Sequence, residues 1–547
     1  MSSLSALPLA NRPVAMGVNG MVTSAHPLAS LAGQRMLMEG GNAFDAAVAT
    51  AVTLNVVEPY MSGVGGIGLA LAHVAAEGRV RALNFSGRAP QSATPDRFTD
   101  ETKQTGILAP LVPGNVAGWL SLHETYGVLD RERVFQPAIE YADKGFPVTY
   151  LNSRIMARSA IRLAPFPSGS IIVDGNGHTP GPGARLMMPQ LAGSLRQIVA
   201  GGKETFYRGE LAQRIVAGNQ ELGGLYTLDD LADYDAEWQD PISIDYRGYK
   251  IHTTPPNSSG FQVLETLKIM EGFDGMDLIF QHPDTLHLLM EAIKLAVTDR
   301  IRYGGDPDHV ETPLAGLLSN TYAAKQRERI DRDKVSVVSG EHFSRQVPTG
   351  SLLAGSPDEF DGGMTTHFAT ADRDGNVVTV TQTLGGGFGC AVAPGDTGIF
   401  LNNMSYWFDL EEGSPNLIGP GKRVDFCIAP TQTLKDGKFF LSIGTPGGWG
   451  ILQTTPQFLM HVLDYGMNVQ EAIEAPRFRC IEGDHIEMEE RFPAHVRRAL
   501  EDKGHEVGVV EAFSMSVGGC QGIRVDTDTG VFQGGADPRR DGFAIGW

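Results

Sequence analysis

The chain is poor in cysteine, lacks a long apolar run and carries more acidic than basic residues. Its four cysteines, Cys390, Cys427, Cys480 and Cys520, include no close metal-type pair, so we expect reduced thiols and not a disulfide framework. No segment approaches the roughly 20 apolar residues of a membrane-spanning helix. A formal net charge of −20 argues against nucleic acid or an anionic membrane surface as a partner.

Targeting and cofactor motifs are missing as well. Residues 1–18 have no basic start and no apolar run of signal-peptide length, which favours a cytoplasmic protein. The 14 histidines form no H-E-x-x-H motif, and the spacing of His282 and His287 is wrong for one helical face, so no metal is expected. Gly63–Gly68 fits the G-x-G-x-x-G pattern but follows a helical segment and not a strand, which argues against a dinucleotide. We therefore expect no cofactor.

The most informative segment begins at Thr365. Strand-like runs cover Thr365–Ala371 and Val377–Thr383, and apolar and polar residues roughly alternate along both. The stretch before them, residues 356–363, has low hydrophobicity. A cut just before Thr365 would give this residue a free α-amino group, and it would then carry a nucleophile and a base together.

The turn between the two runs predicts a register. A three-residue loop, Arg373–Gly375, places its glycine in the left-handed region and pairs Asp372 with Asn376. Counting outwards pairs Thr365 with Thr383, with Cβ atoms about 5 Å apart. A second hydroxyl is therefore expected beside Thr365. An ordinary Thr-rich hairpin is the alternative interpretation, and a slip of one residue would break the pair.

A glycine-rich loop, Gly444–Gly448, follows the strand-like run Phe439–Ile443. Consecutive glycines let backbone N–H groups approach a ligand closely. A developing oxyanion needs such donors, fixed in place before the reaction. The alternative is a tight turn without a catalytic role.

These segments, together with others spread over residues 18 to 540, resemble the γ-glutamyltranspeptidase family. The motifs that carry the resemblance occur in the family's order. They are Glu39–Ala43, Asp45–Ala47, Ser62–Gly66, Val112–Gly114, Val116–Gly118, Asp299–Arg300, Gly305–Pro307, Thr365–Phe368, Asp374–Asn376, Leu401–Asn403, Gly419–Arg423, Pro446–Gly448 and Ala536–Arg539.

The resemblance implies an α/β fold, the four-layer αββα sandwich of the N-terminal-nucleophile hydrolases, in a self-cleaving precursor. The chain would cut its own Met364–Thr365 bond. The products, a large subunit Met1–Met364 and a small subunit Thr365–Trp547, would stay together as one catalytic body and heterodimer. A higher oligomer remains open.

The resemblance also implies the catalytic roles. Thr365 Oγ would attack a small-molecule amide, with its own α-amine as base and the Thr383 hydroxyl assisting. The N–H groups of Gly447 and Gly448 would hold the oxyanion. The acyl group would then pass to water or to an amine acceptor.

The pocket that binds the γ-glutamyl group in this family departs from the family pattern. An Arg that holds the substrate α-carboxylate is replaced by Ser86, with Arg88 two residues further on. An Asp that holds the α-ammonium is replaced by Trp407. The full set of positions expected to meet the substrate is Ser86, Arg88, Gly385, Met404, Trp407, Phe426 and Cys427.

The replacements change the chemistry of the pocket. A zwitterionic glutamyl group needs charged partners, and charges left unpaired in a closed site are costly. Met404, Trp407 and Phe426 instead give the composition of an apolar or aromatic site. We therefore expect an amidase or acyltransferase with a less charged acyl group. The alternatives are a true γ-glutamyltransferase (glutathione hydrolase) and, from another class, an uncleaved non-catalytic binding protein of the same fold.

Periodicity and capping signals predict local elements. Asn42 is the expected N-cap of a buried helix reaching Val57, with Asp45 at the third helical position as a variant capping box. We expect a long amphipathic helix over Thr285–Tyr303 and a mobile segment over Asp331–Gly363, which ends at the cut. A short helix is expected at Val469–Ala475, with Asn468 as its N-cap and Glu471 three residues on. Strands are expected at Met21–Ser24, Gly68–His73, Val80–Asn84 and Ser243–Thr253.

Overall fold

The computed structural model describes residues 10–273, 278–336 and 364–547. The segment predicted to be mobile, Asp331–Gly363, lies outside the described residues from residue 337 onward. Within the described residues, none of the helices is both long and apolar enough to cross a membrane.

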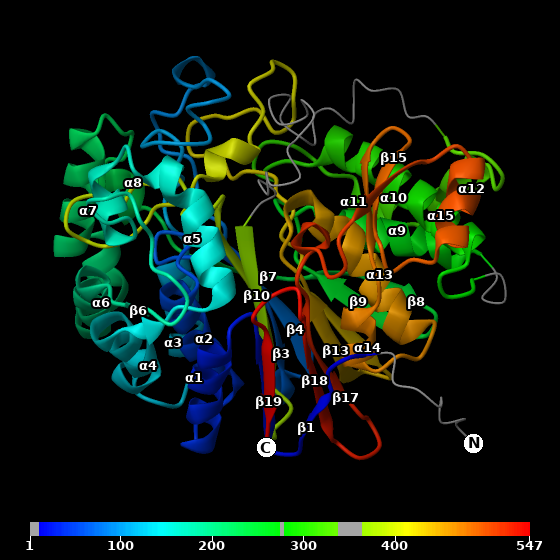
Figure 1. The fold of residues 1–547 in the computed structure, drawn as a ribbon, viewed down its shortest axis with the longest axis horizontal. Coiled ribbons are helices and arrows are strands. Elements are labelled where there is room, and N and C mark those ends of the chain that lie inside the picture. Colours follow the sequence, from blue (N-terminus) through cyan, green and yellow to red (C-terminus); the bar gives the residue numbers. More distant parts are fainter. Residues whose placement is uncertain (1–9, 274–277, 337–363) are drawn as a thin grey trace.

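Two seven-stranded sheets lie at the centre, and all neighbouring strands within each are antiparallel (Figure 1). Sheet 1 has the order β19 (Phe543–Gly546), β2 (Gly20–Ser24), β10 (Met364–Asp372), β11 (Val377–Gly385), β3 (Ile67–Val74), β4 (Arg79–Phe85) and β7 (Glu237–Gln239). Sheet 2 has the order β1 (Ala15–Gly17), β18 (Phe532–Ala536), β17 (Gln521–Val525), β13 (Lys438–Gly444), β12 (Thr431–Lys435), β9 (Tyr249–Thr253) and β8 (Ile242–Tyr246).

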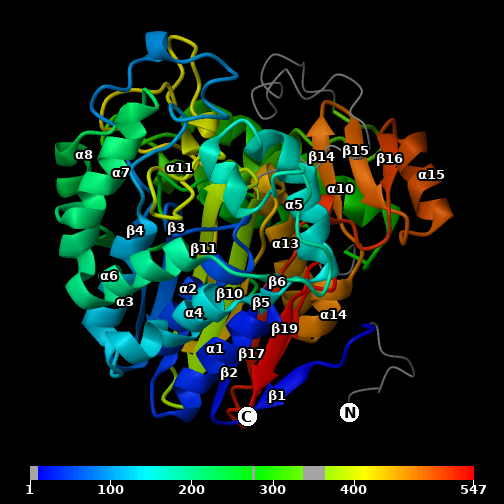
Figure 2. The same ribbon diagram turned by 60° about the vertical axis from the view of Figure 1, so that its left-hand side comes forward.

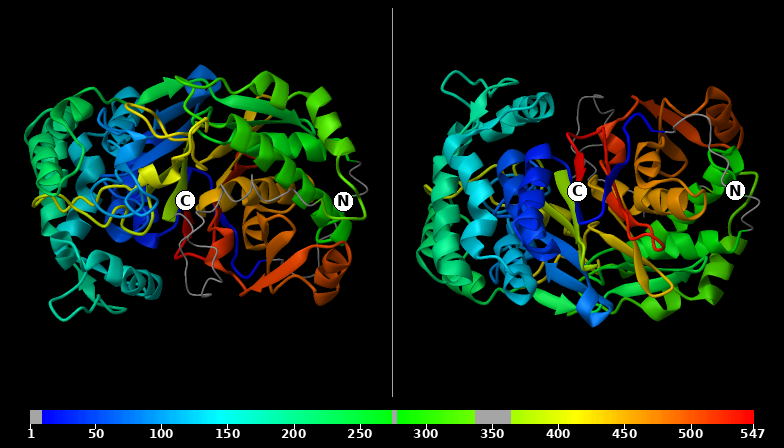
Figure 3. Two further views of the ribbon diagram at one scale, coloured as in Figure 1. Left: turned by 90° about the horizontal axis from the view of Figure 1, so that it is seen from above. Right: turned by 90° about the horizontal axis from the view of Figure 1, so that it is seen from below.

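Helices cover the outer faces of both sheets, as the views along the layers show (Figure 3). On the side of sheet 1 lie α1 (Pro27–Met38), α2 (Ala43–Val57), α3 (Asn115–Tyr126), α4 (Arg131–Lys144) and α6 (Pro189–Tyr207). On the side of sheet 2 lie α9 (Phe261–Glu271), α10 (Pro283–Tyr303), α13 (Ile451–Leu463) and α14 (Val469–Glu474). The predicted four-layer αββα sandwich is confirmed.

The remaining elements are shorter or peripheral. The helices are α5 (Tyr150–Leu163), α7 (Glu210–Glu221), α8 (Leu228–Ala232), α11 (Leu314–Leu317), α12 (Asn320–Glu328) and α15 (Ala494–Asp502). The strands are β5 (Phe146–Pro147), β6 (Arg185–Leu186), β14 (Phe478–Glu482), β15 (His485–Glu489) and β16 (Glu506–Val510).

Each central sheet mixes strands from before and after the Met364–Thr365 bond. In sheet 1, β10 and β11 lie between β2 and β3, near the centre of the molecule (Figure 2). In sheet 2, β12 pairs with β9 and β1 pairs with β18. Neither half of the chain therefore builds a complete sheet alone, so two fragments cut at this bond would remain interleaved.

Local signals account for several elements. Asn42 Oδ1 accepts from the N–H groups of Phe44 and Asp45, and the Asp45 carboxylate accepts from Asn42 N, so the predicted capping box is confirmed. The helix it begins, α2, is buried on every side. A second box, Asn468 with Glu471, begins α14 as predicted.

Two predicted elements are wrong in part. The strand over Ser243–Thr253 is a hairpin, because Arg247 and Gly248 both adopt positive φ, +48° and +84°, and reverse the chain. The helix over Thr285–Tyr303 begins at Pro283, and it is not amphipathic over most of its length. It is buried from Thr285 to Val297 because α9, α15 and β14 pack around it.

Candidate active site

The hairpin β10–β11 has the predicted register. Thr365 pairs with Thr383, Asp372 N donates to Asn376 O at 3.1 Å, and Gly375 has φ +90°. A bulge between Met364 and Thr365 places Met364 opposite Gly385. The bulge breaks the regular ladder at the bond between Met364 and Thr365.

Three hydrogen bonds meet at the hydroxyl of Thr383. Thr365 Oγ donates to Thr383 Oγ at 3.2 Å, and Gly385 N donates to it at 2.8 Å. Thr383 Oγ in turn donates to the carbonyl oxygen of Met364 at 2.6 Å. Thr365 is only 5% exposed. A continuous hydroxyl chain thus runs from Thr365 through Thr383 to the carbonyl of the bond before Thr365.

The neighbour of Thr365 binds a buried carboxyl group that the sequence analysis missed. Thr366 Oγ donates to Glu58 Oε2 at 3.0 Å, and Glu58 follows the last residue of α2. Burial raises the pKa of Glu58 from 4.5 to about 7, while Arg540 and the Thr366 bond act in the opposite direction. Only the three-dimensional packing of α2 on β10 brings Glu58 here, and the sequence contains no local signal for it.

Two contacts define how β13 crosses the hairpin. Ser442 Oγ and Thr379 Oγ lie 2.7 Å apart, and Thr379 pairs with Ala369. Gly444 packs on the imidazole of His367, since a Cβ on Gly444 would lie 2.3 Å from Cε1 of that ring. From Ser442 to Gly444 the chain of β13 thus advances by two residues, and the facing position on β10 moves back by two, from Ala369 to His367.

The loop after β13 therefore begins opposite His367, two residues along β10 from Thr365. Gly447 has φ +135° and Gly448 has φ +57°, conformations that side chains disfavour. Thr445 Oγ accepts from Gly519 N at 3.0 Å, which ties the loop to the neighbouring strand connection. The loop is a compact turn that requires positive φ at Gly447 and Gly448, which glycine adopts readily.

The two residues expected at the α-carboxylate position have other partners. Ser86 is buried, and its Oγ is bonded to the side chain of Asn257. Arg88 donates to Gly421 O and to Asp308 Oδ2, both at 3.0 Å. Arg88 is thus held at a partly exposed ion pair.

The apolar members of the predicted pocket gather, with one exception. A Cβ on Gly385 would lie 3.3 Å from Met404 Sδ, and Met404 packs in one buried cluster with Phe426. Trp407 is half-buried against the same cluster. Cys427 belongs to a different core cluster, behind sheet 2, where burial raises the pKa of its thiol.

Trp449 joins this group, and the sequence analysis did not single it out. Its ring forms a T-shaped contact with Trp407, with centroids 5.1 Å apart. Arg300 Cζ lies 3.7 Å from the centre of the Trp449 ring. The sequence could have pointed to Trp449, because this residue directly follows Gly448 in the glycine-rich loop.

One group of side chains in the described part of the chain has the composition of a metal site. Ligand atoms of His287, Glu291 and His505 lie within 4.8 Å of one another. His287 Nδ1 and His505 Nε2 are already bonded to each other at 2.8 Å, and Glu291 pairs with Lys294. In the described structure the two histidines therefore bind each other, and the carboxylate of Glu291 binds the Lys294 ammonium.

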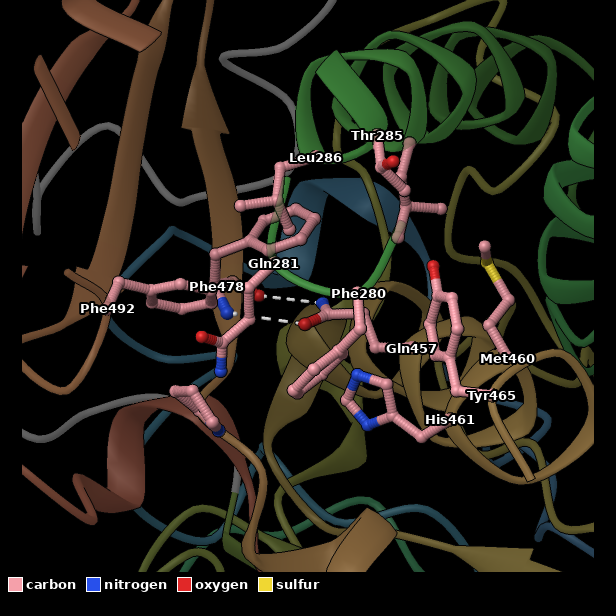
Figure 4. Close-up of a pocket in the computed structure, with 12 residues that line it drawn as sticks. Phe280, Gln281, Thr285, Leu286, Gln457, Met460, His461, Tyr465, Phe478 and Phe492 are labelled. Carbon is pink, nitrogen blue, oxygen red and sulfur yellow. Dashed lines mark hydrogen bonds between the residues drawn. The ribbon is translucent and has the colours of Figure 1, made fainter. Parts of the chain in front are cut away.

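A small hollow lies between α10, α13 and β14 (Figure 4). Phe280 and His461 form one wall, and the amide of Gln457 is bonded on both sides to the backbone of Phe478, at 2.9 and 3.3 Å. Its volume of about 20 Å³ suits about one water molecule. It is too small for an acyl group.

Comparisons with known proteins agree with this geometry. Residues 29–547 match the family model described as gamma-glutamyltranspeptidase. The glutathione hydrolase-like YwrD proenzyme of Bacillus subtilis is 38% identical over 97% of this chain and 99% of its own length. The acylase ACY 1 proenzyme of Pseudomonas sp. strain V22 is 37% identical over 97% and 94%. The crystal structure of cephalosporin acylase from Bacillus halodurans superposes with a TM-score of 0.90 at 34% identity, covering 100% of this chain and 99% of that one.

The sandwich of two antiparallel sheets between helices, with these neighbours, defines an N-terminal-nucleophile hydrolase fold and an amide hydrolase or acyltransferase. The chain belongs to the γ-glutamyltranspeptidase family.

Proposed function

We propose that the chain cuts itself between Met364 and Thr365 and then acts as an amidase or acyltransferase through Thr365. The observation that carries the proposal is the hydroxyl chain from Thr365 through Thr383 to Met364 O. A hydroxyl that donates to a carbonyl polarises it, and it stabilises the negative charge that develops on its oxygen during attack.

The relay supplies the proton transfers of self-cleavage. As Thr365 Oγ bonds to the Met364 carbonyl carbon, its proton moves to Thr383 Oγ, and the Thr383 proton moves to the carbonyl oxygen. Collapse breaks the C–N bond and returns a proton to the leaving nitrogen. This leaves an ester on Thr365 Oγ and a free α-amine. Water hydrolyses the ester, and two interleaved fragments remain as a heterodimer.

The free α-amine then acts as the base for Thr365 Oγ in each turnover. The oxygen attacks a small-molecule amide, and the N–H groups of Gly447 and Gly448 stabilise the oxyanion. The leaving amine takes the proton from the α-amine. Water or an amine acceptor then removes the acyl group from Thr365.

The proposed acyl group is less charged than γ-glutamyl. Ser86 and Arg88 are engaged with Asn257 and Asp308, so the site presents no free cation from this loop for an α-carboxylate. Met404 lies next to Gly385 in a buried apolar cluster, and the partly exposed ring of Trp407 packs against that cluster. The acylase names of two relatives are in keeping with an acyl group other than γ-glutamyl.

A γ-glutamyl hydrolase or transferase is the second candidate, favoured by the glutathione hydrolase-like relative. One sample distinguishes the two. Intact mass and N-terminal sequencing should find two fragments, the smaller beginning Thr-Thr-His-Phe. Turnover of phenylacetyl 4-nitroanilide above that of γ-glutamyl 4-nitroanilide supports the first candidate. The reverse order supports the second, and a single uncut chain contradicts both.

A further inference from the structure

Trp449 stands where it can limit the acyl group. It directly follows Gly448, so the two Cα atoms are about 3.8 Å apart. Its ring meets that of Trp407 at 81°, and both rings are half-buried. Two rings at right angles form a corner that offers aromatic contacts to a planar group.

A buried cation lies against the same ring. Arg300, on α10, is 4% exposed, and its Cζ lies 3.7 Å from the centre of the Trp449 ring. Its nearest anion is Asp425, with Oδ2 3.7 Å from Nη1, and Asp425 is itself bonded by the hydroxyl of Ser259 at 2.7 Å.

The remaining donors of Arg300 are unused. Among the described residues, its Nε and Nη2 have no hydrogen-bond partner. Buried donors without partners are costly, and a guanidinium binds a carboxylate with two parallel bonds where it can reach one. The ring of Trp449 covers one face of the Arg300 guanidinium, and Trp449 is the more exposed of the two residues.

We propose that Trp449 determines acyl specificity by screening Arg300, so that the site takes neutral, planar acyl groups and rejects those that carry a carboxylate. The inference rests on the proposed function, since it assumes that acyl transfer to Thr365 takes place beside Gly447 and Gly448. It extends that function by naming the acyl class and the residue that selects it.

The test compares two anilides on four proteins. Phenylacetyl 4-nitroanilide carries a neutral aromatic acyl group, and glutaryl 4-nitroanilide carries a carboxylate without an ammonium. For Trp449→Ser, we expect kcat/KM to fall about tenfold for phenylacetyl and to rise about tenfold for glutaryl. Trp449→Phe, the matched control, should keep the wild-type preference. Trp449→Ser combined with Arg300→Met should lose the glutaryl gain.

Two results would overturn the inference. An equal fall for both anilides in Trp449→Ser would show that the ring has only a structural role. A glutaryl gain that persists without Arg300 would show that another group binds the carboxylate. Either result leaves the proposed function intact. That proposal is tested separately on the wild-type protein, and it would be contradicted by the absence of fragments or by a preference for γ-glutamyl 4-nitroanilide.

A measurement on the wild-type enzyme covers the case in which Trp449→Ser fails to fold. Phenylacetate and glutarate are the free acids of the two acyl groups and should differ as competitive inhibitors. We expect phenylacetate to inhibit at a concentration at least about tenfold lower than glutarate does. Equal inhibition, or stronger inhibition by glutarate, would contradict screening of Arg300 by the ring.

Discussion

The hairpin that carries Thr365 and the aromatic wall formed by the rings of Trp407 and Trp449 are held in place by different interactions. Thr365 and Thr383 are paired residues of one ladder, so the backbone places their hydroxyls 3.2 Å apart. Trp407 and Trp449 come from segments over 40 residues apart, and their rings are in contact. A rigid ladder suits a reaction that needs fixed atoms. A packed wall tolerates replacement by side chains of similar volume, so it can change the acyl group without changing the chemistry.

Thr365→Ala should have the largest effect on either region, because it removes the attacking oxygen. We expect one uncut chain of 58.7 kDa that hydrolyses no amide. Intact mass spectrometry and the anilide assays measure the two outcomes. Thr365→Ser keeps a hydroxyl in place and serves as the control, which should still split. An alanine variant cut at the same bond would mean that the nucleophile is another residue.

Thr383→Val tests the ladder one step from the nucleophile. Valine keeps the shape but removes the hydroxyl that serves Thr365 Oγ, Gly385 N and Met364 O. Loss of one donor to an oxyanion lowers a rate by about 10²–10³-fold. We expect self-cleavage to slow by that order, followed as the decay of the uncut mass with time. Thr383→Ser should cleave nearly as the wild type does. A valine variant with an unchanged rate would remove Thr383 from the relay.

Glu58→Gln tests the buried carboxyl group that accepts a hydrogen bond from Thr366 of the hairpin. Burial raises the pKa of Glu58 from 4.5 to about 7, so the folded chain holds this proton more tightly than the unfolded chain does. The stability from that proton is fully present below about pH 4.5, and it is lost as the pH rises through about 7. In the uncut Thr365→Ala background, Glu58→Gln should remove this loss, about 3 kcal/mol of unfolding free energy between pH 4.5 and 8. Denaturant unfolding at both pH values measures it, and parallel pH dependences of the two chains would contradict the assignment.

The same contrast explains what could be predicted from the sequence. The Thr365–Thr383 register and the Asn42 and Asn468 caps depend on residues close together in the chain, so turn and capping signals suffice. The contact of Arg300 with Trp449 joins residues 149 positions apart, and nothing local predicts it.

Local signals also fail where tertiary packing changes their meaning. The polar residues of α10 led to the prediction of an exposed face. Instead Glu291 and Lys294 pair with each other in the interior, so the helix is covered on all sides over that stretch. The pairing of Thr365 with Thr383 was therefore accessible from the sequence, whereas the contacts of Trp449 with Trp407 and Arg300 required the fold.

Arg88→Met should have the smallest effect, and it tests whether Arg88 takes part in binding the acyl group. Arg88 is 35% exposed and pairs with Asp308, which is 53% exposed, so the ion pair contributes less than about 1 kcal/mol to stability. Because the guanidinium is held there and at Gly421 O, we expect kcat/KM on neutral and γ-glutamyl anilides to stay within about twofold of wild type. Asp308→Asn, which breaks the pair from its other side, should behave alike. A tenfold loss confined to γ-glutamyl anilide in Arg88→Met would mean that Arg88 leaves Asp308 to bind the substrate carboxylate, and the wall would then have to include this loop.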